Sequence, residues 1–353
     1  MRPIRLFTLG ALALTSALVL AGCSAPADTA GTAELPPMPE ATGEWAEVVA
    51  AAEAEGVVSV YSVLVPAVNT KIEEEFEKAY PKIDIQIVRV LGNEIDARMK
   101  AERETGAATA DLVLNVDYDS MLQYAADGDL FDAVGPNATD ARWIESGGLI
   151  DDKIQLTATT GIVMAWNTDI VSDPPKDIED ILDDRFKGLV GVPANDNLSL
   201  ASFWAFLTEL KPTYWEELAD QEPKFYSSAV PTQEALVSGE IGVTFYAVPA
   251  ILEPVIAQGA PLDWAAANPM WGPQTLSYMP NWNPSSPNAA QVVFDWLGSE
   301  QGQAVVGTDN VSVLDTPGTL QTFENTHMVD FDTQLDQEWV AAQQAEWRKV
   351  FGR

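Results

Sequence analysis

The sequence predicts an α/β fold built from doubly wound sheets, and three observations support this prediction. Short apolar stretches alternate along the chain with segments whose apolar residues recur every three or four positions, as strands alternate with amphipathic helices. Roughly 310 residues follow an N-terminal export segment and its tether, which is enough for two domains of ordinary size. Hydrophobic residues make up 47% of the chain, and its single cysteine excludes an intramolecular disulfide, so packing must stabilise the fold.

Residues 1–22 have the order of a secretory signal peptide. A basic start with Arg2 and Arg5 precedes a long apolar run, and small residues stand before Cys23. The stretch Leu20-Ala21-Gly22-Cys23 resembles the bacterial lipobox, and this resemblance implies that Cys23 is diacylated and becomes the new N-terminus. The alternative is an ordinary cleavable signal followed by an incidental cysteine. Because two or more acyl chains hold a protein firmly, the lipobox predicts attachment to the cell membrane.

The segment after Cys23 is expected to be a lipidated, disordered tether covering residues 23–43. It consists mainly of Ala, Thr, Gly and Pro, and such a composition cannot bury enough apolar surface to fold. No later apolar segment approaches the about 18 residues that a membrane span requires. The folded part is therefore expected to work in water on the extracytoplasmic face of the membrane.

The first half of the folded part is expected to alternate between helices and strands. Trp45, Val48, Val49 and Ala52 have helical spacing, and Gly56 ends that helix. Strands are then expected at residues 57–61, 83–90 and 111–116, with helices at 68–80, 94–104 and 119–126.

The second half repeats the pattern. Strands are expected at residues 161–166, 189–193 and 241–246, with helices at 177–182, 198–210, 232–237 and 249–258. A last helix carries Leu335, Trp339, Trp347 and Phe351 on one face. In doubly wound sheets, ligands bind beyond the carboxyl ends of the strands.

A series of short motifs, each weak alone, recurs in a characteristic order. These motifs are Tyr61-Ser62, Phe76-Glu77-Lys78-Ala79-Tyr80-Pro81, Ala97-Arg98-Met99-Lys100-Ala101-Glu102, Ala110-Asp111-Leu112-Val113, Met164-Ala165-Trp166-Asn167-Thr168, Asp183-Asp184-Arg185-Phe186-Lys187-Gly188, Pro287-Asn288-Ala289-Ala290 and Phe294-Asp295-Trp296-Leu297-Gly298-Ser299-Glu300-Gln301-Gly302-Gln303. Their order and spacing resemble those of the bacterial extracellular solute-binding proteins of ABC transporters, in the branch that includes ferric-iron, thiamine, polyamine and phosphate-ester binders.

This resemblance implies a periplasmic-binding-protein-like fold of type II, with two α/β lobes joined by hinge strands. Lobe 1 would comprise residues 44–158 and 272–315, and lobe 2 residues 159–271 and 316–353. The chain would cross between the lobes near residues 155–165 and 270–282, and the last helix would pack back on lobe 2. A small solute would be clamped between the lobes by hinge closure and delivered to the permease of an ABC importer. A monomer is expected.

Candidate ligand-binding residues follow the expected strands. They are Tyr61, Ser62, Asn93, Asn115, Asp117, Tyr118, Thr160, Asn195, Asn197, Ser199 and Tyr246. Hydroxyl, amide and carboxylate groups at such positions can fix a polar ligand, and helix N-termini can hold an anion. The asparagines have an alternative role as helix N-caps, and Tyr61 and Ser62 as ordinary core and turn residues.

No metal or cofactor is expected at this site. The iron-binding relatives grip Fe³⁺ with two neighbouring tyrosines, whereas this chain has Phe245, Tyr246 and Ala247. A ferric ion needs several oxygen ligands, so a small organic or oxyanionic solute is expected instead, with ferric iron as the alternative. The spacing of Asn115, Asp117 and Asp119 resembles a calcium loop, but Ser120 stands where that turn needs glycine.

The net charge of −34 excludes nucleic acid as a partner, because phosphates would be repelled. Its acidic residues are spread through the chain, which also fits solubility in a salty or acidic habitat. An enzyme is not expected, because the chain has neither a G-x-S-x-G nor an H-E-x-x-H motif and only one histidine, His327. A surface-anchored hydrolase that uses two carboxylates is the rival from a different class.

Four aromatic residues gather in a segment rich in Pro and Asn. Trp264, Trp271, Tyr278 and Trp282 are expected to anchor an irregular loop to the core. The alternative is an aromatic wall for an organic ligand, because indole faces suit rings and organic cations.

Overall fold

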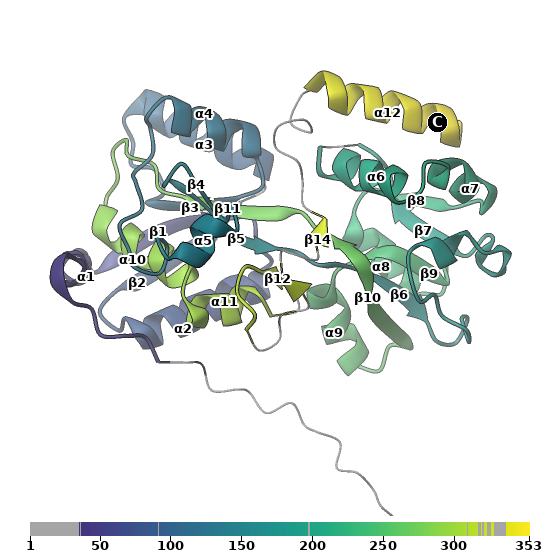
Figure 1. Cartoon of the computed structure of the whole chain (residues 1–353), viewed down its shortest axis with the longest axis horizontal. Helices are drawn as coiled ribbons and strands as arrows, with labels where there is room; N and C mark the ends of the chain where they lie inside the picture. The colour runs from purple at the N-terminus through teal and green to yellow at the C-terminus, as the bar shows by residue number, and fades with distance from the viewer. Residues whose placement is uncertain are drawn as a thin grey trace, which may run out of the picture. The chain divides into compact units, whose positions relative to one another are not determined.

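The computed structural model describes residues 35, 37–90, 92–196, 198–308, 310–316, 319, 321–322, 326–327 and 337–353. The signal segment and Cys23 lie outside the described residues, as do Asn197 and most of the tether. Residues Leu35–Arg353 form one compact unit. Within this unit the strands belong to two separate sheets (Figure 1).

The first sheet has the strand order β13-β12-β5-β11-β3-β1-β2, with β4 beside β5. Its strands are β1 (Val57–Ser62), β2 (Asp84–Arg89), β3 (Leu112–Asn115), β4 (Leu149–Ile150), β5 (Ile154–Thr159), β11 (Gln274–Tyr278), β12 (Val311–Ser312) and β13 (Gln321–Thr322). Strand β1 runs parallel to β2 and β3, whereas β11 is antiparallel to both β3 and β5. The helices of this part are α1 (Gly43–Glu55), α2 (Pro66–Ala79), α3 (Gly92–Thr105), α4 (Tyr118–Ala126), α5 (Ala141–Glu145), α10 (Pro287–Leu297) and α11 (Glu300–Val306).

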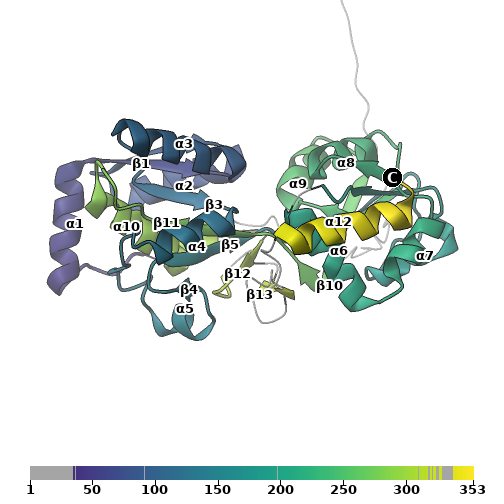
Figure 2. The same cartoon turned by 90° about the horizontal axis from the view of Figure 1, so that it is seen from above.

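Helices cover both faces of the first sheet, because its strands send alternate side chains to opposite sides. Val58 and Val60 of β1 lie in a core cluster with Phe76 of α2 and Val292 of α10. Tyr61, from the same strand, lies in another cluster with residues of α3 and α4. Figures 1 and 2 show α3 and α4 on one side of this sheet, with α2 and α10 on the other.

The second sheet has the strand order β14-β10-β6-β9-β7-β8. Its strands are β6 (Ile162–Asn167), β7 (Val190–Pro193), β8 (Lys224–Tyr226), β9 (Val243–Ala247), β10 (Leu262–Trp271) and β14 (Thr326–His327). Its helices are η1 (Glu179–Leu182), η2 (Asp184–Phe186), α6 (Leu198–Leu210), α7 (Tyr214–Asp220), α8 (Ala229–Val237), α9 (Pro249–Ala257) and α12 (Gln337–Phe351). Strand β7 is parallel to β8 and β9, while β6 is antiparallel to β9 and β10.

Helix α12 brings the end of the chain back to the second sheet's helices. The ring of its Trp347 lies 5.7 Å from that of Trp204 on α6 and 4.9 Å from that of Phe225 on β8. The sequence expected this helix to pack on the second lobe, and these ring contacts account for its apolar face.

The chain passes between the sheets after β5, after β10 and after β13. The first two connections are neighbours. They run side by side, because the Thr160 N–H donates to the Pro273 carbonyl at 3.0 Å. A Cβ atom at Gly272 would lie 2.2 Å from the Thr160 carbonyl oxygen, so only glycine allows this close approach. Both connections fall within the ranges that the sequence indicated.

The structure corrects two expectations about local structure. The segment expected to be an irregular aromatic loop forms β10 and β11, in which Trp271 and Tyr278 are buried. A register shift between Ala266 and Trp271 lets β10 accommodate its Asn-Pro pair. The helix expected at residues 177–182 is only the short 3-10 helix η1. The Asp177 carboxylate accepts hydrogen bonds from the Glu179 and Asp180 N–H groups, and such local bonds favour a turn over a longer helix.

Candidate functional site

The candidate ligand residues lie at the carboxyl ends of parallel strands in both sheets. We call residues 61–64 and 115–118, which end or follow β1 and β3, the first edge. We call residues 194–196, 198–199 and 246–248, which end or follow β7 and β9, the second edge. Strands β7 and β9 pair Gly191 with Thr244, so their carboxyl ends lie side by side.

Ser62 at the first edge is buried and fully engaged with the protein. Its hydroxyl donates to Asn69 Oδ1 at 2.8 Å and accepts from the Leu64 N–H at 3.1 Å. The Asn69 Nδ2 group donates in turn to the Leu64 carbonyl at 3.1 Å. This closed network fixes the turn between β1 and α2, so Ser62 has a structural role in this structure.

Tyr61 points towards α3. Its hydroxyl donates to Glu102 Oε1 at 2.7 Å, and the Arg98 guanidinium lies 4.3 Å from the centre of its ring. Arg98 also forms an ion pair with Glu102 at 2.9 Å. Burial and the hydrogen bond to Glu102 raise the pKa of Tyr61 to about 12.

Tyr118 begins α4 and is buried, and its hydroxyl makes two hydrogen bonds with the backbone of Gln274. It donates to the Gln274 carbonyl at 2.8 Å and accepts from the Gln274 N–H at 3.0 Å. The phenol therefore joins α4 to β11, and its ring presents an apolar surface. A small hollow beside this ring is lined by Met121, Leu122, Ile150, Ile154 and Leu276.

Asn115 and Asp117 lie next to Tyr118. Asn115 is buried, accepts from the Val116 N–H at 2.8 Å and hydrogen-bonds to Tyr278. Asp117 is partly buried as the N-cap residue of α4, and burial raises its pKa. Thr160 lies on a connection between the sheets, where its backbone pairs with Pro273.

Asn195 at the second edge differs from these residues. It is 2% exposed, and neither Oδ1 nor Nδ2 has a hydrogen-bond partner among the residues that the structure describes. It stands two positions after β7 and three before α6. A buried amide without hydrogen-bond partners costs free energy of folding, so the burial of Asn195 requires an explanation.

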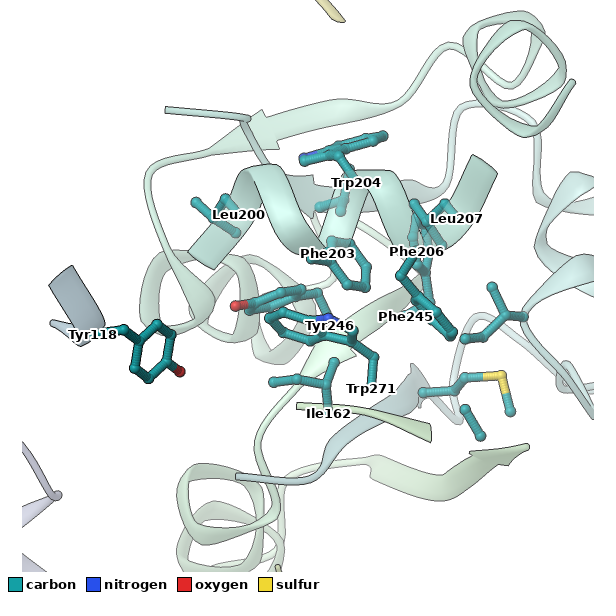
Figure 3. Close-up of a cluster of buried hydrophobic side chains, with 14 of the residues drawn as sticks. Tyr118, Ile162, Leu200, Phe203, Trp204, Phe206, Leu207, Phe245, Tyr246 and Trp271 are labelled. Carbon is teal, nitrogen blue, oxygen red and sulfur yellow. The ribbon is translucent and has the colours of Figure 1, made fainter. Parts of the chain in front are cut away.

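Tyr246 ends the neighbouring strand β9 and hydrogen-bonds to Ser199 on α6. Burial raises the pKa of Tyr246, and the nearby Asp196 raises it further. Its hydroxyl points towards Tyr118 in Figure 3, and Tyr246 in turn raises the pKa of Tyr118. The two phenols, from β9 and α4, therefore face a common region.

Aromatic rings pack around Tyr246 (Figure 3). The ring of Phe203 lies 4.7 Å away at an interplanar angle of 84°, and that of Trp271 lies 6.1 Å away. Trp271 is 1% exposed, and its indole N–H has no partner among the described residues. The same holds for Oε1 of Gln274, which is also 1% exposed.

Sequence reasoning did not single out Trp271 and Gln274 as polar site residues. The aromatic residues between positions 264 and 282 include Trp271, but their apolar rings indicated a role in anchoring a loop to the core. Nothing in the sequence marks Gln274. Of the other candidates, Asn93 lies on α3 with its side chain outside the described residues, and Asn197 is outside them entirely.

Carboxylates set the electrostatic character of this region. Burial is the main cause of the raised pKa of Tyr246 and Tyr278; Asp196 raises the pKa of Tyr246 further, and Asp117 and Asp96 raise that of Tyr278. Asp96 also forms an ion pair with Lys100 at 2.8 Å. Within the described ranges, no three His, Cys, Asp or Glu side chains are grouped to hold a metal ion. Over the same ranges, no helix is both long and apolar enough to cross a bilayer.

Comparison with known proteins identifies the family. The family model of bacterial extracellular solute-binding proteins matches residues 71–311, whereas no curated protein matches the sequence. A substrate-binding protein of an ABC transporter from Agrobacterium tumefaciens has a similar structure, with 16% identity and a TM-score of 0.65 over 86% of this chain and 97% of that chain.

Two further structures have a similar fold. AfuA from Actinobacillus pleuropneumoniae, with fructose-6-phosphate bound, has 15% identity and a TM-score of 0.58 over 84% of this chain and 99% of its own. Iron-bound HitA from Pseudomonas aeruginosa has 15% identity and a TM-score of 0.56 over 83% of this chain and 99% of its own. At these identities the likeness shows the fold alone.

The family match covers most of the chain and includes strands of both sheets and the connections that follow β5 and β10. Its members are transport proteins that work outside the cytoplasm, so the carboxylate-dependent hydrolase that the sequence left open gains no support. The chain belongs to the bacterial extracellular solute-binding family and has the fold of the type II periplasmic binding proteins.

Proposed function

We propose that this chain is the membrane-anchored substrate-binding component of an ABC importer, which captures a small solute at the two edges and delivers it to the permease. One observation carries the location of the site. Among the residues that the structure describes, buried polar atoms of Asn195, Trp271 and Gln274 have no partner, and the rings of Tyr118 and Tyr246 face a common region. Ligand sites are mostly apolar, with a few polar groups that fix orientation, and this region has that composition.

Closure would use the paired connections between the sheets. We assign residues 44–159, 272–315 and 321–322 to one lobe, and residues 160–271, 326–327 and 337–353 to the other. This corrects the boundaries that the sequence indicated, because Thr159 and β13 belong to the first sheet. Thr160 and Pro273 hydrogen-bond to one another at the boundary, and Gly272 permits their close approach. A hinge requires few residues to change their backbone angles, and these short connections meet that requirement.

The test combines thermal unfolding with small-angle scattering. The panel comprises Fe³⁺ with carbonate, thiamine, spermidine, sugar phosphates, phosphonates and sulfate. A true ligand is expected to raise the melting temperature and to shrink the radius of gyration, and the scattered intensity should give the mass of a monomer. Binding without a change in the radius of gyration would contradict hinge closure.

The proposed solute is organic or oxyanionic, in preference to ferric iron. A ferric ion is held by several oxygen anions, and phenolates are formed only when the phenol loses its proton. Burial raises the pKa of both Tyr118 and Tyr246, and the Tyr118 hydroxyl already bonds to Gln274. Adding Fe³⁺ with carbonate should therefore give no phenolate-to-iron absorption band, whereas a strong band would favour the iron alternative.

Cys23 is the proposed point of lipid attachment. Support comes from the lipobox-like Leu20-Ala21-Gly22-Cys23 at the end of the apolar signal. In cells fed a labelled fatty acid, the wild-type chain should carry the label and partition into detergent. Cys23→Ser should lose the label and appear in the aqueous phase. Equal labelling of both proteins would exclude Cys23 as the acylated residue.

A further inference from the structure

Asn195 can be compared with a similarly buried asparagine of the second sheet, Asn167. Asn167 is 3% exposed and ends β6, and both of its amide atoms are paired. Its Nδ2 group donates to the Leu236 carbonyl at 3.0 Å, and its Oδ1 accepts from the Asp169 N–H at 3.0 Å. Asn195 is equally buried and has neither bond among the described residues.

The side-chain atoms of Asn195, Trp271 and Gln274 that lack partners among the described residues require a particular partner chemistry. Oδ1 of Asn195 and Oε1 of Gln274 are acceptors, while Nδ2 of Asn195 and Nε1 of Trp271 are donors. A compound that satisfies this set must supply both N–H or O–H donors and acceptors. Sulfate supplies acceptors alone, so it would leave both oxygens unpaired.

The charged side chains near these residues also favour an organic solute over an oxyanion. The charged side chains that act on Tyr246 and Tyr278 are the carboxylates Asp196, Asp117 and Asp96. Asp96 forms an ion pair with Lys100 at 2.8 Å, so the repulsion of an anion comes chiefly from Asp196 beside Tyr246. Asp196 would repel a fully ionised oxyanion, whereas it would not repel a neutral or cationic compound. The aromatic faces of Tyr246, Trp271 and Phe203 suit the apolar part of an organic molecule.

We propose that the Asn195 carboxamide binds a group of the solute that carries an N–H or O–H donor, so that the solute is an organic amine, amide or hydroxyl compound rather than a donor-free oxyanion. This inference rests on the proposed function and narrows its ligand class. Asn195 therefore acts in recognition, and its unpaired state lowers the stability of the ligand-free protein.

Asn195→Leu tests both consequences, because leucine has nearly the same size and removes the amide. The purified full chain is incubated with spermidine, thiamine, glucosamine, glutamine and sulfate together with the low-molecular-weight fraction of yeast extract. It is then desalted and denatured, and the released compounds are identified by mass spectrometry. The wild type should retain an organic compound with amine, amide or hydroxyl groups, and Asn195→Leu at least about tenfold less.

Melting temperatures of the ligand-free proteins separate recognition from a structural role. Asn195→Leu should melt at the wild-type temperature or above, because it removes an unpaired buried amide. The control Asn167→Leu should melt lower and, once folded, retain the same compound as the wild type. Sulfate retention that depends on Asn195, or equal retention by Asn195→Leu, would overturn the inference.

A fall in melting temperature for Asn195→Leu as large as that for Asn167→Leu would also overturn it. If the wild type retains nothing, the proposed function itself is contradicted, and this inference with it. Failure of the proposed function, in which the wild type retains nothing, is therefore distinguishable from failure of this inference, in which retention does not depend on Asn195.

Discussion

The first and second edges occupy equivalent positions in their sheets, but their buried polar side chains differ in whether they have hydrogen-bond partners. At the first edge, Ser62 and Tyr61 have partners within the protein. At the second edge, Asn195 is buried without one among the described residues, and aromatic rings surround the neighbouring Tyr246. Polar pairing thus stabilises the first edge, while aromatic packing supports the second, where the Asn195 amide has no partner among the described residues.

The largest effect is expected from the aromatic support of the second edge. Phe203 is fully buried and contacts the rings of Trp204, Phe245, Tyr246 and Trp271. Phe203→Ala should lower the free energy of unfolding by about 3–5 kcal/mol, because it removes apolar contacts and leaves a cavity. Urea unfolding measures this loss. The control Phe203→Leu should lose less, and an equal loss in both variants would contradict a packing role.

A smaller loss is expected at the first edge. Asn69→Leu removes the partners of Ser62 and of the Leu64 carbonyl and leaves both groups buried or partly buried. The free energy of unfolding should fall by about 1–3 kcal/mol in urea unfolding. The comparison between the edges would fail if Asn69→Leu cost more than Phe203→Ala, or if it cost nothing while Asn195→Leu was destabilising.

Tyr246→Phe should have a modest effect on stability, because it removes only the hydroxyl that bonds to Ser199. We expect a loss of about 0.5–1.5 kcal/mol in the free energy of unfolding, measured in urea. The ring contacts with Phe203 and Trp271 should persist, and near-ultraviolet circular dichroism checks them. A loss as large as that of Phe203→Ala would mean that the second edge depends on polar pairing after all.

The smallest effect concerns alkaline pH at the first edge. The pKa of Tyr61 rises from 10.0 to about 12 in the folded protein, so the folded state holds this proton more tightly than the unfolded state. The resulting stability is complete below pH 10 and is lost as the pH rises towards about 12. Between these values the melting temperature of Tyr61→Phe should fall less steeply than that of the wild type. Parallel slopes would show that folding does not raise the pKa of Tyr61.

The fold was largely predictable from the sequence, because most strands and helices have the apolar spacing of their type. Strand β10 was missed, since its Asn268-Pro269 pair is typical of a loop and the register shift that accommodates it leaves no sequence signal. The site was harder to predict. Tyr118 was a good candidate by position, but its hydroxyl bonds to Gln274, which is 156 residues away in the chain. Whether a buried amide such as Asn195 finds a partner depends on such distant contacts.

The order of the strands in the chain has a consequence for synthesis and export. Strand β11 and helix α10 complete the first sheet, yet they follow the segment from β6 to β10 that belongs to the second sheet. During translation, β1, β2 and β3 therefore emerge long before α10, which covers Val58 and Val60 together with α2. A chain interrupted before residue 274 would expose that apolar face to proteases. A ribosome or export channel must deliver nearly the whole polypeptide before its first strands are protected.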